Sequence, residues 1–355
     1  MGDTMTHRQL PVGHPARSAA ATALWTSTAA GTAFTAFAYL TTQVRAVRAG
    51  SPWQDDPYDA VVTFTLFFVP LLGALGAGRM PLCRRDRPLP CHRVGQLLRT
   101  ALVGTLLVGA TLATDWAAVA VRADRGLWNG GTPWLIASLA VLTAVTALCL
   151  FLHRRAAGLL PATARPDGDW LDDVAPLVAL LTHRHPRVGQ GLARLTGLGG
   201  VPGFVRGRFT ALAATAALAA GLLVAAGLAS GEGWPGALLF AVEAAVFAGG
   251  TFAFLMICNG VLRIAAPGPV SGARRAARIA ATAAASALPV ALALRDPLWR
   301  LLGLGPRADS VGQWAVVMLA AALLTGVSAF GAAMVLLDRP ARGRGGRAGT
   351  PNDAP

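Results

Sequence analysis

The chain has 355 residues, of which 54% are hydrophobic and 14% are charged. Soluble globular proteins carry roughly 25% charged residues, so this composition, with a mean hydropathy of +0.53, excludes an ordinary soluble domain. The formal net charge is +14 and all 31 basic residues are arginine, but they stand in short segments between apolar runs, so we do not expect nucleic acid as a partner.

Eight apolar runs follow one another along the chain. A helix that crosses a bilayer needs about 20 mainly apolar residues. The runs of about that length are 19–40, 58–78, 97–121, 133–152, 209–229, 235–262, 279–294 and 313–337. They predict an all-α integral membrane protein with about eight transmembrane helices. The first run is longer than the roughly 7 to 15 apolar residues of a secretory signal, so we expect it to be retained as a span.

Arginine-rich segments alternate with arginine-poor ones between these runs. The rich segments are 79–93, the central segment 154–208, 263–278 and the tail 339–355. Because arginine is retained on the cytoplasmic side of a membrane, we expect both termini, including residues 1–18, to be cytoplasmic. The segment 295–307, on the predicted outer side, is a mild exception because it also contains arginine. The tail is rich in arginine, glycine and proline, and we expect it to be disordered.

Three acidic residues, Asp55, Asp56 and Asp59, open the second run. Asp56 can cap a helix, and Asp59 favours the positive end of its dipole. The same residues match the DDxxD pattern with which prenyl-diphosphate enzymes hold magnesium, and membrane prenyltransferases resemble this chain in helix count. That family carries two such motifs on cytoplasmic loops, whereas this one is predicted outside. We therefore interpret the residues as a cap and a loop, and keep a prenyltransferase-like enzyme as a minor alternative.

The central segment 154–208 is a basic linker between two apolar halves, 19–153 and 209–338. Within it, apolar residues recur at helical spacing from Trp170 to Leu181, and Asp172 and Asp173 take the other face. This pattern predicts either an interfacial helix or a short helix packed on the protein's own cytoplasmic face. In either case the arginines are expected to attract anionic lipids.

The two halves resemble each other in order and in several residues. Trp134 and Trp314 open the last run of each half. The third runs align so that Arg99 matches Arg278. Chance matching of alanine, leucine, glycine and arginine is the alternative, but tryptophan is matched less easily by chance. With four spans in each half, we expect two tandem halves in the same orientation, related by an axis along the membrane normal.

The candidate ligand-binding residues are Asp115 and Glu243, the clearest acidic residues inside predicted spans. A carboxylate at the centre of a spanning helix costs about 2.5 to 3.5 kcal/mol on insertion scales, so each should face protein or water. Both are expected roughly 10 Å below the outer surface and to share an outward-facing cavity between the halves, with a proton-coupled or cation-binding role. The alternative is that each is an interfacial residue, with Trp116 at the headgroup boundary.

No metal or cofactor site is expected. Cys83, Cys91 and His92 lack the closely spaced cysteine pairs of structural zinc sites, and a fourth ligand is not evident. We interpret them as part of a reduced cytoplasmic loop. The sequence has no HExxH, GxSxG, Walker A or dinucleotide-binding motif, so we predict that the protein is not an enzyme.

The stretch Ser51-Pro-Trp-Gln-Asp-Asp-Pro-Tyr-Asp-Ala-Val-Val62, followed by an apolar span, resembles uncharacterised multi-pass membrane proteins of high-GC actinobacteria. The resemblance covers mainly the first two spans and implies a place in the bacterial plasma membrane, with no assigned activity. Two hypotheses of function remain. The first is a transporter or permease-like subunit with a site between the halves. The second is a non-transporting sensor or scaffold whose basic cytoplasmic face docks a protein partner.

Overall fold

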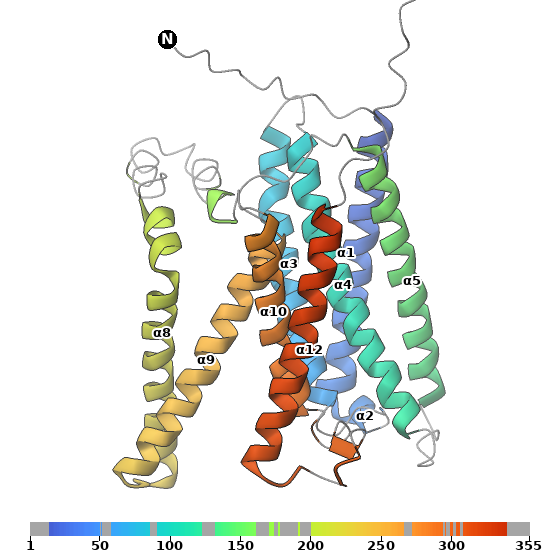
Figure 1. Ribbon diagram of the computed structural model, residues 1–355. Helices are drawn as coiled ribbons and strands as arrows, with labels where there is room; N and C mark the ends of the chain where they lie inside the picture. Colours follow the sequence, from blue (N-terminus) through green and yellow to red (C-terminus); the bar gives the residue numbers. More distant parts are fainter. Residues whose placement is uncertain are drawn as a thin grey trace, which may run out of the picture.

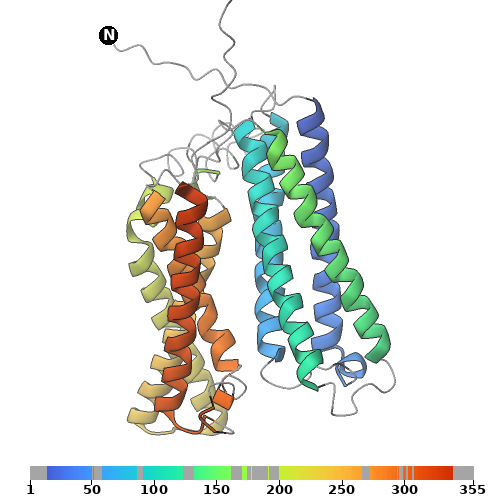
Figure 2. The ribbon, with the colours of Figure 1, turned by 45° about the vertical axis from the view of Figure 1, so that its right-hand side comes forward.

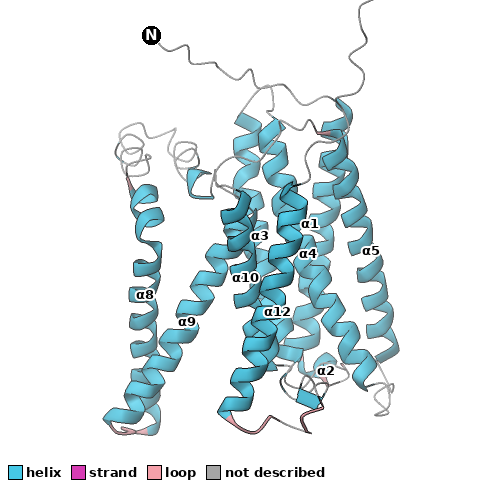
Figure 3. Ribbon diagram, viewed as in Figure 1, coloured by secondary structure: helices cyan, strands magenta, loops and turns pink. Residues whose placement is uncertain are grey.

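In the computed structural model of the chain, nearly all of the described residues belong to helices, and a few form loops (Figure 3). The described residues are 14–49, 51, 58–85, 91–122, 132–160, 170–173, 177, 191, 200–265, 272–293, 295, 299–300, 303–305 and 308–338. None of these residues belongs to a strand. This agrees with the predicted all-α class.

Eight long helices account for the eight apolar runs, with small differences at the ends. They are α1 (His14–Gln43), α3 (Tyr58–Arg85), α4 (Cys91–Arg122), α5 (Thr132–Leu159), α8 (Val201–Glu232), α9 (Ala237–Ala265), α10 (Gly272–Ala293) and α12 (Val311–Asp338). Two short elements, α2 (Arg45–Arg48) and the 3-10 helix η2 (Trp170–Asp173), complete the described set. α3 continues without a break through Pro70, and α8 has a kink at Arg208, next to the predicted start of the fifth span.

Within the described residues, five of these helices are long and apolar enough to cross a membrane. Their spanning stretches are Arg93–Ala120, Pro133–Leu159, Val201–Gly231, Ala237–Ala265 and Val311–Met334. α3 contributes a shorter apolar stretch, Thr65–Met80. α1 and α10 are the other two long helices. The protein is therefore an all-α membrane protein, and the count of eight spans stays a prediction.

The first four long helices form one bundle and the last four lie beside it (Figures 1 and 2). In the first group α1 packs against α3, α4 and α5, and α4 packs against α3 and α5. Its core joins residues from all four helices, among them Phe34, Val62, Leu112 and Leu139. In the second group the main contacts follow chain order, from α8 to α9, α10 and α12. The first group is therefore closed around a core, whereas the second is more open.

Contacts between the two groups involve the second and third long helices of each. α3 contacts α10, α4 contacts α9, and α3 also contacts α9. The rings of Phe67 and Phe254 are 4.7 Å apart at their centroids, and Phe68 lies 5.9 Å from the same ring. Because α3 corresponds to α9 and α4 to α10 in chain order, the contacts α3 with α10 and α4 with α9 are equivalent pairings.

Most of the central segment lies outside the described residues. In the described part, η2 lies beside the end of α3 and the beginning of α4. We call this end of the first bundle, where α3 ends and α4 begins, the basic end. Leu171 and Asp173 are buried there, and a Cβ atom on Gly78 of α3 would lie 3.7 Å from Cδ1 of Leu177. These residues therefore contact other parts of the protein, and the choice between the two predicted alternatives for the whole segment stays a prediction.

Candidate functional site

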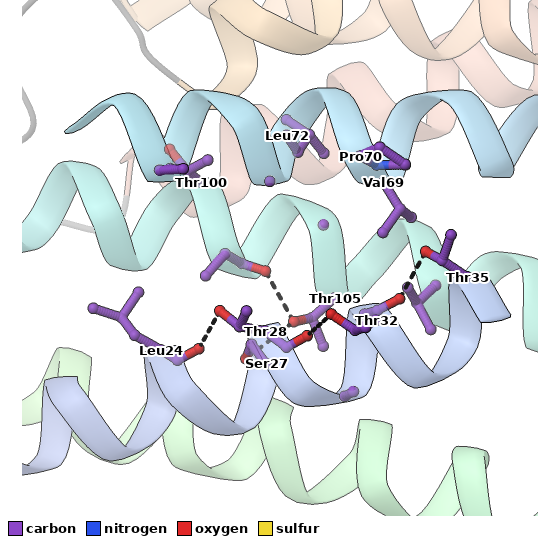
Figure 4. Close-up of a pocket in the computed structure, with 18 of the residues that line it drawn as sticks. Leu24, Ser27, Thr28, Thr32, Thr35, Val69, Pro70, Leu72, Thr100 and Thr105 are labelled. Atoms are coloured by element: carbon purple, nitrogen blue, oxygen red, sulfur yellow. Dashed lines mark hydrogen bonds between the residues drawn. The ribbon is translucent and has the colours of Figure 1, made fainter. Parts of the chain in front are cut away.

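A pocket of about 720 Å³ lies between α1, α3 and α4, with Thr146 of α5 at its wall. Its volume falls within the roughly 300 to 1,000 Å³ of typical ligand pockets. Most of the lining is apolar (Figure 4), including Leu24, Val69 and Leu72. Glycine creates part of the space, since a Cβ atom on Gly73 would meet no atom within 4 Å. The pocket therefore suits an apolar molecule or the apolar part of a larger one.

Hydroxyl groups supply most of the polar side-chain atoms of this lining. They belong to Ser27, Thr28, Thr32, Thr35, Thr100, Thr105 and Thr146, together with the phenol of Tyr39. Thr28 and Thr32 donate hydrogen bonds of 2.9 Å to carbonyl oxygens one turn earlier in α1, and Thr35 donates one of 2.8 Å. Because these protons are used within the helix, the hydroxyl oxygens keep lone pairs for a ligand. The pocket therefore offers hydrogen-bond acceptors to a ligand that carries donors.

Pro70 places a further acceptor at the same pocket. Proline has no amide proton, so it cannot donate the helical hydrogen bond to the carbonyl of Leu66. Both Pro70 and Leu66 line the pocket. In a membrane-spanning helix such a carbonyl is tolerated where other groups or a cavity satisfy it. The carbonyl group that Pro70 leaves without its helical donor therefore belongs to a residue of the pocket lining.

A buried ionic group lies at the basic end of this pocket. The Arg79 side chain is 1% exposed, and its Nη1 atom donates to Oγ1 of the pocket residue Thr100 at 3.2 Å. Its Nε atom lies 2.7 Å from Oδ2 of Asp173 in η2. The other oxygen of Asp173 lies 3.0 Å from Nη1 of Arg93. The central segment is thus joined through Arg79 to the wall of the pocket.

Asp115 lies inside the first bundle. It is 1% exposed, and one carboxylate oxygen, Oδ1, is buried with no hydrogen-bond partner in the described part of the chain. Gly104 and Val108 line the pocket, and Thr111 and Asp115 follow them at intervals of three and four residues, on the same face of α4. Asp115 therefore continues the pocket-lining face of α4 towards the end opposite the basic end.

Glu243 lies in the other group of helices and is half-buried. It belongs to the part of α9 that packs against α8, since its neighbour Ala244 faces Gly221 of α8. The ends of α4 and α9 that carry the two acidic residues lie apart in Figure 1. Neither pocket described for the chain is lined by Asp115 or Glu243. The structure does not bring the pair together, because the halves meet through other parts of α4 and α9.

The weak metal candidates lie outside the described residues. This applies to Asp55 and Asp56 and to the side chain of Asp59, and equally to the side chains of Cys83, Cys91 and His92. Across the part of the chain that is described, no three His, Cys, Asp or Glu side chains form a group that could hold a metal ion.

Two features of this site are not among the predicted site residues. They are Arg79 and the row of threonine hydroxyl groups on one face of α1, which we call the hydroxyl row. Arg79 directly follows the second apolar run, where arginine indicates the cytoplasmic side of the membrane. No sequence pattern pairs it with Asp173. The hydroxyl row could have been predicted from the sequence, because Thr28, Thr32 and Thr35 recur at helical spacing on one face of an apolar run.

The described pocket can hold a molecule by apolar contact and by hydrogen bonds to its oxygens. Its described lining contains no His, Cys, Asp or Glu that would serve as a base or a strong nucleophile. Binding is therefore the chemistry that the lining supports. Comparison with known protein families, with curated proteins and with solved structures finds no match to this chain.

Proposed function

We propose that the protein is a transporter or permease-like subunit that carries a small apolar or amphipathic molecule through the pocket between α1, α3 and α4. The observation that supports this most directly is the pocket of about 720 Å³ among helices that belong to a membrane protein. A pocket in this position is reached by molecules dissolved in the bilayer. The apolar walls hold the body of the ligand, and the hydroxyl oxygens accept hydrogen bonds from its polar group.

The carrier would have eight spans in two tandem four-helix halves of the same orientation, in the plasma membrane of a bacterium. The equivalent pairings of α3 with α10 and of α4 with α9 support this architecture. We propose that the basic end is cytoplasmic, with both termini on that side, and lies against anionic lipids. The contact between the halves is formed by helices that also line the pocket, α3 and α4. Movement of one half against the other would therefore reshape the pocket, as alternating access requires.

Asp115 gives the proposed path a second polar position. It lies seven residues beyond Val108 on α4, or roughly 10 Å at 1.5 Å per residue. Ionisable residues inside membrane helices commonly mark ion or substrate pathways. A donor group of the ligand, or a proton, would pass from the hydroxyl row to this carboxylate.

A second candidate function is that of a membrane sensor. The observation that favours it is the chain of contacts from Thr100 in the pocket wall through Arg79 to Asp173 in the central segment. A ligand that displaces Thr100 would disturb a buried ion pair that holds the central segment. The basic segment would then present a different surface to a protein partner.

Photolabelling in proteoliposomes tests whether the pocket binds such a molecule. The probe is a long-chain alcohol that carries a diazirine in its chain, so that its hydroxyl group supplies the donor. Labelled residues are mapped by mass spectrometry. We expect labels on α1, α3 and α4 at the pocket, and their loss in Gly73→Leu, because the new side chain grows into open space. Gly249→Leu is the matched control, since Gly249 on α9 also has no atom within 4 Å of an added Cβ. Equal labelling of the pocket in both variants would contradict the proposal.

Two further measurements separate the carrier from the sensor. A carrier should move a fluorescent long-chain alcohol across the proteoliposome membrane faster than it crosses empty liposomes, and Gly73→Leu should abolish the difference. A sensor should bind the probe without flux, and binding should change the rate at which trypsin cleaves the central segment. Flux that persists in Gly73→Leu would place the path elsewhere.

A further inference from the structure

A second pocket, of about 270 Å³, lies where α4 of the first half meets α9 and α10 of the second. Four arginine side chains line it: Arg99, Arg263, Arg275 and Arg278. The guanidinium group stays protonated in proteins, so four positive charges surround one small cavity. No Asp or Glu is found among the described residues of its lining.

The arginines come together because of how the helices end. Arg263 lies in the last turn of α9, and Arg275 and Arg278 lie in the first turns of α10. Arg99 reaches them from α4, where its Nε atom donates a 2.7 Å hydrogen bond to the carbonyl of Ile264. That bond fixes the guanidinium and uses one of its five N–H donors. Four donors of Arg99 are therefore left for other acceptors.

Gathering these charges has a cost that a bound anion would remove. Like charges that are brought close together in a protein repel one another. Arg263 and Arg275 also take part in other interactions, so an anion would rely mainly on Arg99 and Arg278. Arginine binds phosphate well because its planar fork donates two parallel hydrogen bonds. A phosphate group therefore fits both the charge and the donors of this pocket.

The rest of the lining identifies the neighbouring part of the ligand. Met256, Ile279 and Ala285 form an apolar side of the pocket, deeper along α9 and α10 than the arginines. Asn259 is 7% exposed and its Oδ1 atom is buried with no partner among the described residues. A hydroxyl group of a ligand would satisfy that oxygen. The lining thus suits a phosphate that carries a hydroxyl group and continues into an apolar chain.

The pocket also belongs to the contact between the two halves. Arg99 and Arg278 occupy matching positions in the third long helix of each half, and both line it. Close approach of α9 and α10 forms one wall, since a Cβ atom on Gly260 would lie 2.8 Å from Cγ2 of Thr282. An anion bound by both halves would hold them together at the end predicted to be cytoplasmic.

We propose that this arginine pocket is a binding site for a phosphate-bearing anion that links the two halves of the protein. The phosphate can come from the headgroup of an anionic phospholipid or from a soluble phosphate. The site is independent of the pocket between α1, α3 and α4. It extends the general attraction of basic segments to anionic lipids to one defined place.

The test uses the full chain, purified free of lipid in a non-ionic detergent. Dioleoyl phosphatidylglycerol, dioleoyl phosphatidylcholine, glycerol 3-phosphate and inorganic phosphate are added separately. Bound molecules are counted by native mass spectrometry, and the shift in Tm is measured. We expect phosphatidylglycerol to bind and raise Tm, and phosphatidylcholine to do neither. If the soluble phosphates match phosphatidylglycerol at equal concentration, the source of the phosphate is soluble and the site stands.

Single substitutions then identify the site. Arg275→Gln and Arg278→Gln should each weaken binding about tenfold or more, the usual loss for a hydrogen bond to a charged group. Arg274→Gln is the matched control, because Arg274 is exposed, adjacent in sequence and outside the lining. Without added anion, Tm of Arg278→Gln should stay equal to or exceed that of the wild-type protein, since a like charge has been removed. An equal loss of binding in Arg274→Gln, or no binding of any phosphate, would overturn the proposal.

Discussion

Oδ2 of Asp173 lies 2.7 Å from Nε of Arg79, although 94 positions separate the two residues in the chain. Both side chains are at most 6% exposed, and the second oxygen of Asp173 accepts from Arg93. One carboxylate therefore forms ion pairs with two arginines at the basic end. Because Arg79 also bonds Thr100, this carboxylate connects the central segment with the pocket between α1, α3 and α4.

The first prediction concerns this ion pair. Asp173→Asn removes the negative charge and leaves Arg79 buried without its counter-ion. Breaking a buried pair from one side typically costs about 3 to 5 kcal/mol, so we expect a free energy of unfolding lower by roughly 3 kcal/mol. The measurement is unfolding in a graded series of detergent mixtures, with trypsin cleavage of the central segment as a second readout.

Asp309→Asn is the control for Asp173→Asn. Asp309 is exposed and lies just before α12, where a carboxylate contributes about 0.3 to 1 kcal/mol through the helix dipole. Its loss should leave trypsin cleavage of the central segment unchanged. Equal effects of the two substitutions would mean that Asp173 does not anchor the segment.

The helices could be predicted from the sequence because a span must be about 20 apolar residues long, and arginine interrupts these runs at regular places. Contacts between residues that are distant in the sequence could not be predicted in this way. Nothing local in the sequence distinguishes Asp173, which is buried, from Asp172 beside it, and Arg79 looks like any other arginine after a span. Burial of such a residue is decided by the packing of helices that are far apart in sequence.

The candidate sites also contain features that the sequence predicts and features that it does not. Asp115 was predictable, because a carboxylate within a spanning helix must avoid lipid, and it is indeed buried. Its pairing with Glu243 relied on equal depth alone, which does not determine the position of a helix around the bundle. The arginine pocket could not be foreseen either, since the same arginines serve as topology signals whether they face water or one another.

A second prediction concerns the close approach of α8 and α9. A Cβ atom on Gly221 would lie 2.7 Å from the amide nitrogen of Ala248 and 2.8 Å from its Cβ. Gly221→Ala should therefore push the helices apart and lower the free energy of unfolding by about 1 to 3 kcal/mol. Gly227→Ala, on the same helix but with no atom within 4 Å, should be stabilising by about 0.5 to 1 kcal/mol. Crosslinking of cysteines placed across α8 and α9 would detect the separation.

A third prediction tests the hydrogen bond between α3 and α4. The hydroxyl oxygens of Thr65 and Thr111 lie 2.5 Å apart, and Thr111 also donates to the carbonyl of Leu107. Thr111→Val keeps the shape and removes the acceptor for Thr65. The loss should be about 0.6 kcal/mol and at most about 1.7 kcal/mol, the range of such bonds in membranes. Thr114→Val should change stability less, because the Thr114 hydroxyl donates within its own helix; the reverse order would show that the interhelical bond contributes nothing.

The last prediction separates the two acidic residues of the membrane helices. Asp115 is 1% exposed with one oxygen unpartnered, so its carboxylate costs stability, up to about 2.5 to 3.5 kcal/mol on insertion scales. Asp115→Asn should therefore raise Tm in detergent while slowing the flux of a fluorescent long-chain alcohol in proteoliposomes. Glu243→Gln, at a half-buried site away from both pockets, should shift stability by no more than about 0.5 kcal/mol and leave flux intact. A lower Tm in Asp115→Asn would instead identify the carboxylate as a structural hydrogen-bond acceptor, and unchanged flux would remove Asp115 from the proposed path.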